Sequence, residues 1–485
     1  MLNNRFQGRN TLKQKINLLD ASWLAIDSED TPMHVGILQT YSLPEGASDT
    51  FLRDDVKRMK EAGEIVSPWN KKLTRSSFIG RTVMAAWSID DDIDLDYHVR
   101  HSALPKPGGE RELGVLVSRL HSHRMDFKRP LWECHVIEGL GNNRFAMYFK
   151  LHHSLIDGVS GVRLLERTLS DTPGDVTMPP WAIKLAQKSS ADKPAKANVL
   201  IRTIQGIKRQ IVVLPLLMRA LGKLISSGIK NNQELTVPFV GPRSMINGRV
   251  RPARRFATQK YSLERIKQLA TATDASLNDI VLYLCSTAMR NFLIERGGLP
   301  EKPLTSGIPV NIRPADDTGT GTAISFIIAD LATNEADPLK RLDIIKQSTQ
   351  VAKEHLQSMP RSALMQYTLL MMAPYTLQLL SGLGGRMRPA FNVTISNVPG
   401  PRKPLYYNGC TLEAMYPVSL IAHGGSLNIT CLSYNGSLNF GYTGCRDTLP
   451  SMQNIAVLSG EALEELEGLV NKQIDHAQPI AINEY

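Results

Sequence analysis

The sequence of 485 residues lacks the features that mark several large classes of protein. No apolar run reaches the roughly 18 uncharged residues that a helix needs to cross a bilayer. The basic N-terminal segment has no apolar stretch of the kind found in a secretory signal. The five cysteines are odd in number and form no CxxC pair, which is typical of a reduced chain without a disulfide framework. We therefore expect a cytoplasmic protein.

Motifs for nucleic acid binding are also missing. There is no zinc-finger spacing, no RNP-type aromatic motif and no long run of lysine or arginine. The formal net charge is nevertheless +10, from 56 Lys and Arg against 46 Asp and Glu. This surplus favours an anionic partner. With nucleic acid excluded, we expect either an acidic membrane surface or a ligand rich in phosphate, such as coenzyme A.

The length predicts two domains, because it exceeds what one hydrophobic core usually supports. The composition changes after residue 170, and we place the domains at residues 1–175 and 241–485, with a linker at residues 176–240. Residues 199–230 within the linker mix apolar runs with six Lys or Arg and no acidic residue. This segment is either an interdomain helix with a solvated basic face or a helix that lies on a membrane surface.

Both halves combine predicted helices and strands. Apolar residues at helical spacing predict helices over residues 18–26, 110–125, 276–293, 337–358 and 447–472. Runs typical of strands cover residues 34–41, 306–312, 323–329, 392–397, 426–433 and 438–442. Two more, residues 132–137 and 144–151, predict a hairpin. Because no βαβ rhythm and no GxGxxG motif accompany them, the fold class we predict is α+β, with two similar domains.

The second hairpin strand leads directly into His-His-Ser-Leu-Ile-Asp-Gly, residues 152–158. Alternation along the strand places His153 on the face of Phe149 and Leu151, and His152 on the opposite face. Imidazole titrates near neutral pH, so a histidine held at a strand end can take a proton from an alcohol. His153 is our candidate for such a general base.

Three alternatives compete with this interpretation. The histidines and Asp157 could bind a metal, but adjacent histidines point apart on an extended chain and no third ligand is near, so we predict no metal site. The pair could also be purely structural. A covalent hydrolase is disfavoured because the sequence has no GxSxG motif and no evident nucleophile. A lone base suits direct attack by an activated hydroxyl on an acyl carrier.

Residues 152–158 match the HHxxxDG motif of the superfamily that contains chloramphenicol acetyltransferase, carnitine acyltransferases and peptide-synthetase condensation domains. Over nearly its whole length the chain resembles the bacterial wax ester synthase/acyl-CoA:diacylglycerol acyltransferase family. The segments that carry this resemblance are Met33–Gly36, Pro130–Trp132 with the following ECHVIEGL, Asn278–Asp279, Pro309–Arg313 and Ser396–Pro401. The resemblance implies two chloramphenicol-acetyltransferase-like domains that face each other across a tunnel and are joined by a helical linker.

The resemblance also implies roles for the motif residues. His153 would be the general base, with His152 beside it. Asp157 would face away from the substrate and organise the loop by pairing with a basic side chain, either Lys72 or Arg313. Gly158 would let the backbone approach its surroundings closely.

Other segments of the resemblance carry weaker expectations. Pro130, Leu131 and Trp132 would either shape the wall of an acyl site or pack the hairpin. Asn278, beside Asp279, would either donate a hydrogen bond to an oxyanion or cap the following helix. Asn397, Pro399 and Gly400 are expected to form a rigid turn.

The reaction implied by the family is transfer of a long-chain acyl group from acyl-CoA to a fatty alcohol, giving a wax ester, or to diacylglycerol, giving triacylglycerol. Acyl-CoA is then a substrate, and no cofactor is expected. The alternatives are a condensation-type enzyme that uses acyl groups on carrier proteins and a non-catalytic lipid-binding protein. We expect peripheral association with the inner membrane surface or with lipid inclusions.

Overall fold

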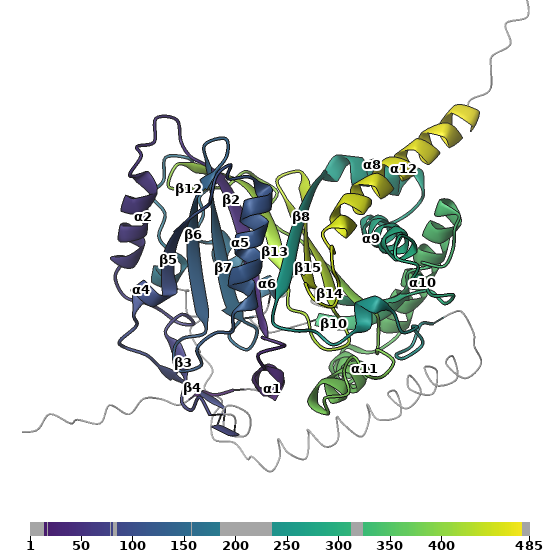
Figure 1. Cartoon of the computed structure of the whole chain (residues 1–485), viewed down its shortest axis with the longest axis horizontal. Helices are drawn as coiled ribbons and strands as arrows, with labels where there is room; N and C mark the ends of the chain where they lie inside the picture. Colours follow the sequence, from purple (N-terminus) through teal and green to yellow (C-terminus); the bar gives the residue numbers. More distant parts are fainter. Residues whose placement is uncertain are drawn as a thin grey trace, which may run out of the picture. The chain divides into compact units, whose positions relative to one another are not determined.

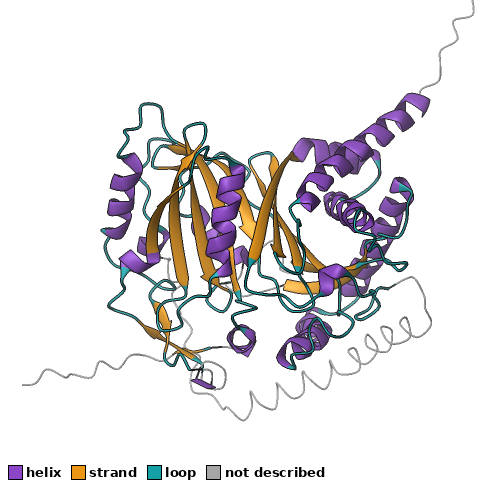
Figure 2. Cartoon of the chain, in the orientation of Figure 1, coloured by secondary structure: helices purple, strands orange, loops and turns teal. Residues whose placement is uncertain are grey.

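The computed structural model describes residues 14–16, 18–77, 79–80, 85–156, 158–184, 235–311 and 324–477. The chain divides into two units, one of residues 1–186 with 403–415 and one of residues 187–402 with 416–485. Each unit combines a β-sheet with helices (Figures 1 and 2), which confirms the predicted α+β class. The limits of the predicted domains stay a prediction, and most of the predicted helical linker lies outside the described residues.

The first unit begins with β1 (Gln14–Lys15), α1 (Leu18–Ile26), β2 (His34–Ser42), α2 (Phe51–Lys60), β3 (Lys71–Leu73) and β4 (Ala86–Ile89). It continues with α4 (Leu95–His98), β5 (Val99–Ala103), α5 (Glu110–Ser122), β6 (Trp132–Leu140), β7 (Arg144–His152), α6 (Gly158–Glu166) and the short 3₁₀ helix η1 (Pro180–Ala182). Strands β12 (Tyr406–Tyr407) and β13 (Cys410–Val418) come from much later in the chain. The predicted helix over residues 18–26 and the strand at residues 34–41 are therefore confirmed.

The main sheet of this unit has the strand order β12-β13-β2-β7-β6-β5. β6 and β7 form the predicted antiparallel hairpin, and β2 pairs with β7 so that His34 lies opposite His152. β7 is buried along almost its whole length because α5 covers the face that carries Tyr148 and Lys150 (Figure 1). The sheet thus delivers the two histidines to the end of a strand that is held on both sides.

The second unit contains the 3₁₀ helix η2 (Met245–Asn247), β8 (Arg254–Ser262), α8 (Leu263–Ala272), α9 (Leu277–Ile294), β9 (Thr305–Asn311) and β10 (Ile324–Asp330). After these come α10 (Pro338–Gln357), α11 (Arg361–Leu380), β11 (Val393–Val398), β14 (Leu427–Tyr434), β15 (Ser437–Cys445) and α12 (Asn454–Ala477). The predicted strands up to residue 433, and the helices at residues 276–293 and 337–358, lie within one or two residues of their observed bounds. The strand predicted over residues 438–442 is part of the longer β15, and the helix predicted over residues 447–472 both begins and ends later, as α12.

The sheet of the second unit has the order β10-β9-β11-β14-β15-β8, with β11 parallel to both of its neighbours. α9 is the central helix of the core, in contact with α8, α10 and α12. It is apolar on nearly all sides, as expected of a helix without a solvent-exposed face. Its first turn is fixed by a capping box between Ser276 and Asp279.

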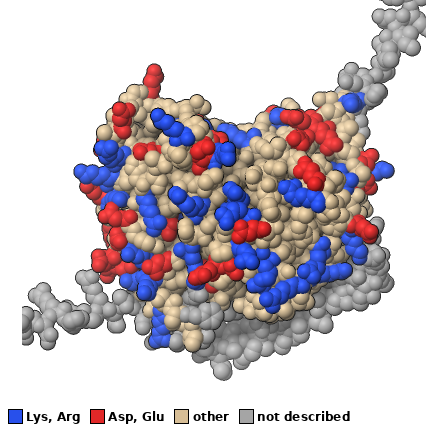
Figure 3. Space-filling model, in the orientation of Figure 1, with Lys and Arg blue, Asp and Glu red and all other residues tan. Residues whose placement is uncertain are grey.

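Charged side chains of both signs lie on the drawn face of the first unit. Over the first unit, the face drawn in Figure 3 shows Lys and Arg interspersed with Asp and Glu. The positive surplus of the sequence therefore does not gather into one continuous patch on that face of this unit.

Candidate active site

His153 follows the last residue of β7 and stands in the turn that leads to α6. Its backbone N–H donates to the carbonyl oxygen of Met33, 2.9 Å away. Its ring packs against the indole of Trp23, with 4.3 Å between the ring centroids. The residue is half-buried. The imidazole is thus supported by α1 and by the chain just before β2, while part of the residue remains accessible.

His152 is almost fully buried, with 1% of its surface exposed. Its Nδ1 accepts a hydrogen bond from the backbone N–H of Ser154 at 3.2 Å and lies 2.7 Å from Oγ of the same serine. A neutral imidazole whose Nδ1 accepts carries its proton on Nε2. That Nε2 lies 3.4 Å from Oδ2 of Asp27. The two adjacent histidines therefore have different surroundings and different exposure.

Asp27 connects this strand end to two other segments of the chain. Its carboxylate accepts hydrogen bonds from the backbone N–H of Met33, at 2.8 Å, and from Nε of Arg124. Burial by itself would raise the pKa of Asp27, but the hydrogen bond and charge of His152, together with Met33 and Arg124, lower it below its ordinary value. Asp27 is consequently ionised at neutral pH.

Two of the predicted motif residues cannot be placed. Asp157 and Arg313 lie outside the described residues. Lys72, the other candidate partner of Asp157, forms an ion pair with Asp90 at 2.8 Å. Gly158 begins α6, and no heavy atom lies within 4 Å of the position that a β-carbon would take. The close approach of backbone to substrate predicted for Gly158 stays a prediction.

The segment Pro130–Trp132 packs the hairpin. Leu131 is fully buried, and its carbonyl accepts from the backbone N–H of His152 at 3.0 Å. The ring of Trp132 stacks against Trp181 at 5.1 Å, and its Nε1 donates to the carbonyl of Trp69 at 2.7 Å. These contacts are the ones expected from hairpin packing, and they place Leu131 directly behind the histidine pair.

Asn278 and Asn397 lie together in the second unit. Nδ2 of Asn397, on β11, donates to Oδ1 of Asn278, in the first turn of α9, at 3.4 Å. The cap of α9 is made by Ser276 and Asp279 and not by Asn278, so the capping alternative for Asn278 is wrong. Asp279 also accepts from Oγ1 of Thr349 at 2.6 Å, which ties α9 to α10. The predicted oxyanion contact of Asn278 stays a prediction.

The structure places Asn397 within β11 and assigns no turn to residues 399–401, so the predicted turn is not seen, although Gly400 is held closely. The backbone N–H of Gly400 donates to Oγ of Ser433 at 3.1 Å. A β-carbon at Gly400 would stand 2.3 Å from the carbonyl oxygen of Ser433, so only glycine fits there. Pro399 precedes this position, directly after the end of β11.

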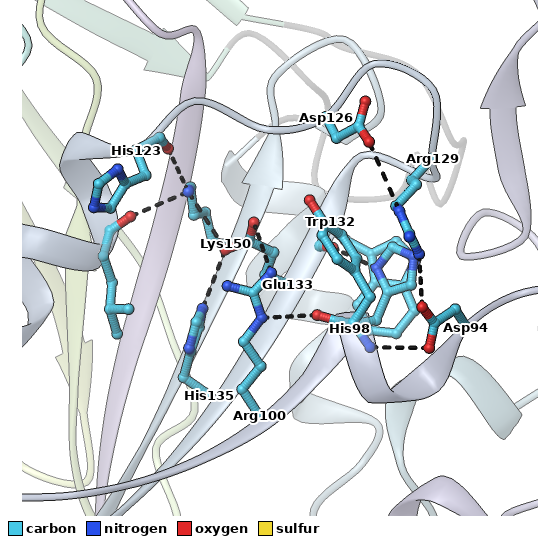
Figure 4. Close-up of polar contacts among 12 residues, drawn as sticks. Asp94, His98, Arg100, His123, Asp126, Arg129, Trp132, Glu133, His135 and Lys150 are labelled. Carbon is cyan, nitrogen blue, oxygen red and sulfur yellow. Dashed lines mark hydrogen bonds and ion pairs between the residues drawn. The ribbon is translucent and has the colours of Figure 1, made fainter.

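A buried ionic cluster occupies the sheet face beneath α5 (Figure 4). Lys150 is fully buried, and its Nζ donates to the carbonyl of Leu120 at 3.1 Å and to that of His123. The same Nζ lies 3.4 Å from Oε2 of Glu133. The ammonium therefore neutralises the carboxylate and the carbonyl end of α5 together. This cluster fixes the helix to the strand that ends in the histidine pair.

Comparison with known proteins identifies the family. Residues 16–281 match the wax ester synthase/diacylglycerol acyltransferase catalytic domain, and residues 320–467 match the C-terminal domain of the same family. A putative diacylglycerol O-acyltransferase of Mycobacterium tuberculosis is 43% identical over 478 residues, which cover 92% of this chain and 96% of that protein. The chain belongs to the wax ester synthase/diacylglycerol acyltransferase family. It is therefore an acyltransferase, as the resemblance implied.

Solved structures agree with this assignment. The wax ester synthase/diacylglycerol acyltransferase of Marinobacter aquaeolei is 36% identical, with a TM-score of 0.76 over 94% of this chain and all of that one. The first condensation domain of the CDA synthetase gives a TM-score of 0.56 at 16% identity, over 95% of this chain and 97% of that one. The second likeness shows the fold alone, and it agrees with the predicted fold class.

Three residues around the histidine pair of this acyltransferase were not predicted from the sequence: Trp23 contacts His153, Asp27 contacts His152, and Arg124 contacts Asp27. Asp27 stands in a polar run that indicates only the end of a helix. Trp23 is one of several apolar residues of α1, and nothing in the sequence distinguishes it from the others. Arg124 follows a helix as an ordinary basic residue. The available signal was the Met33–Gly36 segment of the family resemblance, because Met33 contacts both Asp27 and His153.

Proposed function

We propose that this family member transfers a long-chain fatty acyl group from acyl-CoA to the hydroxyl of a fatty alcohol or of diacylglycerol, with His153 as general base. The observation that supports this most is the contrast between the two histidines. His153 is half-buried and braced by Trp23 and Met33, whereas His152 is enclosed and engaged with Asp27 and Ser154. Only His153 has the exposure that a base acting on a substrate needs.

The proposed reaction has no acyl-enzyme stage. The ring of His153 takes the hydroxyl proton as the alcohol oxygen attacks the thioester carbonyl carbon. The carbon–sulfur bond then breaks, and the imidazolium returns the proton to the thiolate of coenzyme A. An ester and free coenzyme A result, so the reaction as drawn needs neither a metal nor a redox cofactor.

Ser154, His152 and Asp27 lie next to one another in a series that resembles a nucleophile triad in composition. However, Ser154 is 3% exposed and lies within the turn that its own bond to His152 closes. A nucleophile must reach the substrate carbonyl. We therefore assign this series to holding the turn, and we expect Asp157 to help organise the same loop.

One assay tests the proposal. Purified protein is mixed with labelled palmitoyl-CoA and either hexadecanol or dioleoylglycerol, and the labelled ester is measured. Ester formed by the parent protein but not by His153→Ala would support the assignment. Acyl transfer only from an acyl group carried on a carrier protein would favour the condensation-type alternative, and the absence of any transfer would contradict the proposed donor and acceptors.

We also propose that the protein works in the cytoplasm, at the inner membrane surface or on lipid inclusions. None of the described helices is long and apolar enough to cross a membrane. The basic segment at residues 199–230, which lies outside the described residues, is the predicted surface anchor. Replacing Arg202, Lys208, Arg209, Arg219 and Lys223 with Gln should then weaken binding to anionic vesicles.

A further inference from the structure

The outward face of α11 and the turn that follows it carry exposed apolar side chains. Leu377 is 64% exposed and Leu380 is 54% exposed. Leu383 and Met387, in the following turn, are also exposed. These four residues, called here the α11 surface, lie within eleven positions of one another, whereas exposed leucines and methionines in water are usually scattered.

The inner face of the same helix is apolar as well. Leu364, Tyr367 and Met371 are buried in the core of the second unit, where α11 contacts β10. A helix that is apolar on both sides is normally buried all round. α11 is buried on one side only, which leaves the α11 surface without an apolar partner among the described residues.

Three basic side chains lie at or next to the α11 surface. Arg386 and Arg388 flank Met387 and are exposed. Arg249 is also exposed, and its guanidinium donates to the carbonyl of Gly382 at 3.0 Å, which places a third cation at the same turn. No Asp or Glu occurs anywhere from His355 to Leu412. Figure 3 shows Lys and Arg side chains gathered over the region of α11.

We propose that the α11 surface docks this protein onto an anionic lipid surface. Leucine and methionine side chains would enter the boundary between headgroups and acyl chains, while Arg249, Arg386 and Arg388 contact the negative headgroups. This is the pairing of apolar burial with positive charge that interfacial helices use. This docking rests on the proposed function in one respect, because the proposed alcohol and diacylglycerol substrates partition into lipid.

Vesicle cosedimentation tests the apolar part of the α11 surface. The full-length parent should pellet with vesicles of phosphatidylcholine and phosphatidylglycerol, and much less with phosphatidylcholine alone. Leu377→Ser/Leu380→Ser should bind the anionic vesicles at least about tenfold more weakly, because two leucines that would enter the lipid surface are lost. Val457→Ser is the matched control, since Val457 is an exposed apolar residue on α12 of the same unit, and it should bind as the parent does.

The charged part is tested separately with Arg386→Gln/Arg388→Gln. Two basic residues near an anionic surface predict binding roughly twentyfold weaker, with a smaller dependence on salt. Lys267→Gln, at an exposed lysine of α8, is its control. Melting temperatures of all variants establish that they are folded, and the arginine variant still decides the matter if the serine variant does not fold.

Three results separate the possibilities. Vesicle binding by both double variants that equals the parent's would overturn the proposal. The proposal would also be overturned if the parent were a dimer in gel filtration and the double variants were monomers that still bind vesicles. The α11 surface would then join two copies of the chain. Ester synthesis in detergent micelles is measured alongside. A parent that binds vesicles through α11 but makes no ester would refute the proposed function and leave this inference standing.

Discussion

The carboxylate of Asp27 lies 3.4 Å from Nε2 of His152, and both side chains are almost fully buried. The same carboxylate accepts from the backbone N–H of Met33, whose carbonyl in turn accepts from the N–H of His153. Arg124 completes the group. One acidic side chain therefore fixes the two chain segments that hold the proposed base.

We predict that Asp27→Asn lowers both stability and turnover. The amide keeps the shape of the carboxylate but leaves His152 and Arg124 without their anionic partner. Removing one member of a buried pair costs about 3 kcal/mol of unfolding free energy. A displaced histidine turn should also reduce kcat by about tenfold or more. Denaturant unfolding and steady-state kinetics measure these effects, and parental stability with parental kcat would show that Asp27 does not position the turn.

The pH dependence of stability gives a second test of Asp27. Its folded-state pKa is lowered from the ordinary value of 3.8, so its contribution is present above about pH 4 and is lost as the pH falls further. The parent should lose stability on acidification through this range, and Asp27→Asn should lose less. Equal slopes for the two proteins between pH 5 and pH 3 would contradict an ionised Asp27 in the folded state.

His153→Ala should lose at least a hundredfold in turnover, because general base catalysis supplies about 10² to 10⁴. Acyl-CoA binding, measured by calorimetry, should persist because the ring is proposed to act on the alcohol. His152→Ala should lose less turnover but more stability, since it removes one of the groups that neutralise the buried Asp27 carboxylate. An exchange of these two phenotypes would move the base to His152.

Ser154→Ala distinguishes direct transfer from a covalent mechanism. Loss of one hydrogen bond to His152 should cost no more than about tenfold in turnover. Loss of a true nucleophile would instead cost about a millionfold. Mass spectrometry of the parent quenched during turnover should show no acylated protein. An adduct on Ser154, or inactivity of a folded Ser154→Ala variant, would replace the direct mechanism.

The elements that were predicted from the sequence each have a pattern of apolar or β-branched residues within a short stretch of chain. α1, the β6–β7 hairpin and α9 have apolar periodicity or β-branched runs that local spacing shows. α11 has no such pattern, because its apolar residues lie on both sides of the helix, and it was not predicted. β13 could not be placed either, since its pairing beside β2 joins parts of the chain that no short-range pattern connects.

The residues of the candidate site were likewise predicted where a local motif marks them, but their contacts with distant segments were not. His152 and His153 follow from the motif and from the parity of β7. The Asp27–His152 contact depends on tertiary structure, because it needs α1, β2 and the end of β7 to meet. Asn278 and Asn397 were predicted separately, but their mutual hydrogen bond appears only once α9 lies beside β11. Local sequence patterns do not determine which residues far apart in the chain come into contact.

Glu133 and Lys150 provide the last prediction, which concerns the strand that carries the histidines. Burial alone would raise the pKa of Glu133, but the hydrogen bond from His135 and the charges of Lys150 and Arg100 lower it to about 2 (Figure 4). From its ordinary value of 4.5, the stability that this carboxylate contributes is complete above pH 4.5 and is lost as the pH falls toward 2. Acid unfolding of the parent should therefore steepen below pH 4.5.

Glu133→Gln removes the charge but keeps the shape, and it leaves the ammonium of Lys150 buried with only carbonyl partners. We expect a loss of about 3 to 5 kcal/mol of unfolding free energy. Glu133→Leu/Lys150→Met removes both charges, and its loss should be smaller than the summed losses of the single variants Glu133→Leu and Lys150→Met, because a buried apolar pair needs no neutralisation. A double-mutant cycle in denaturant measures the difference. Additive losses would mean that the two groups contribute independently and that the ion pair does not hold β7 beneath α5.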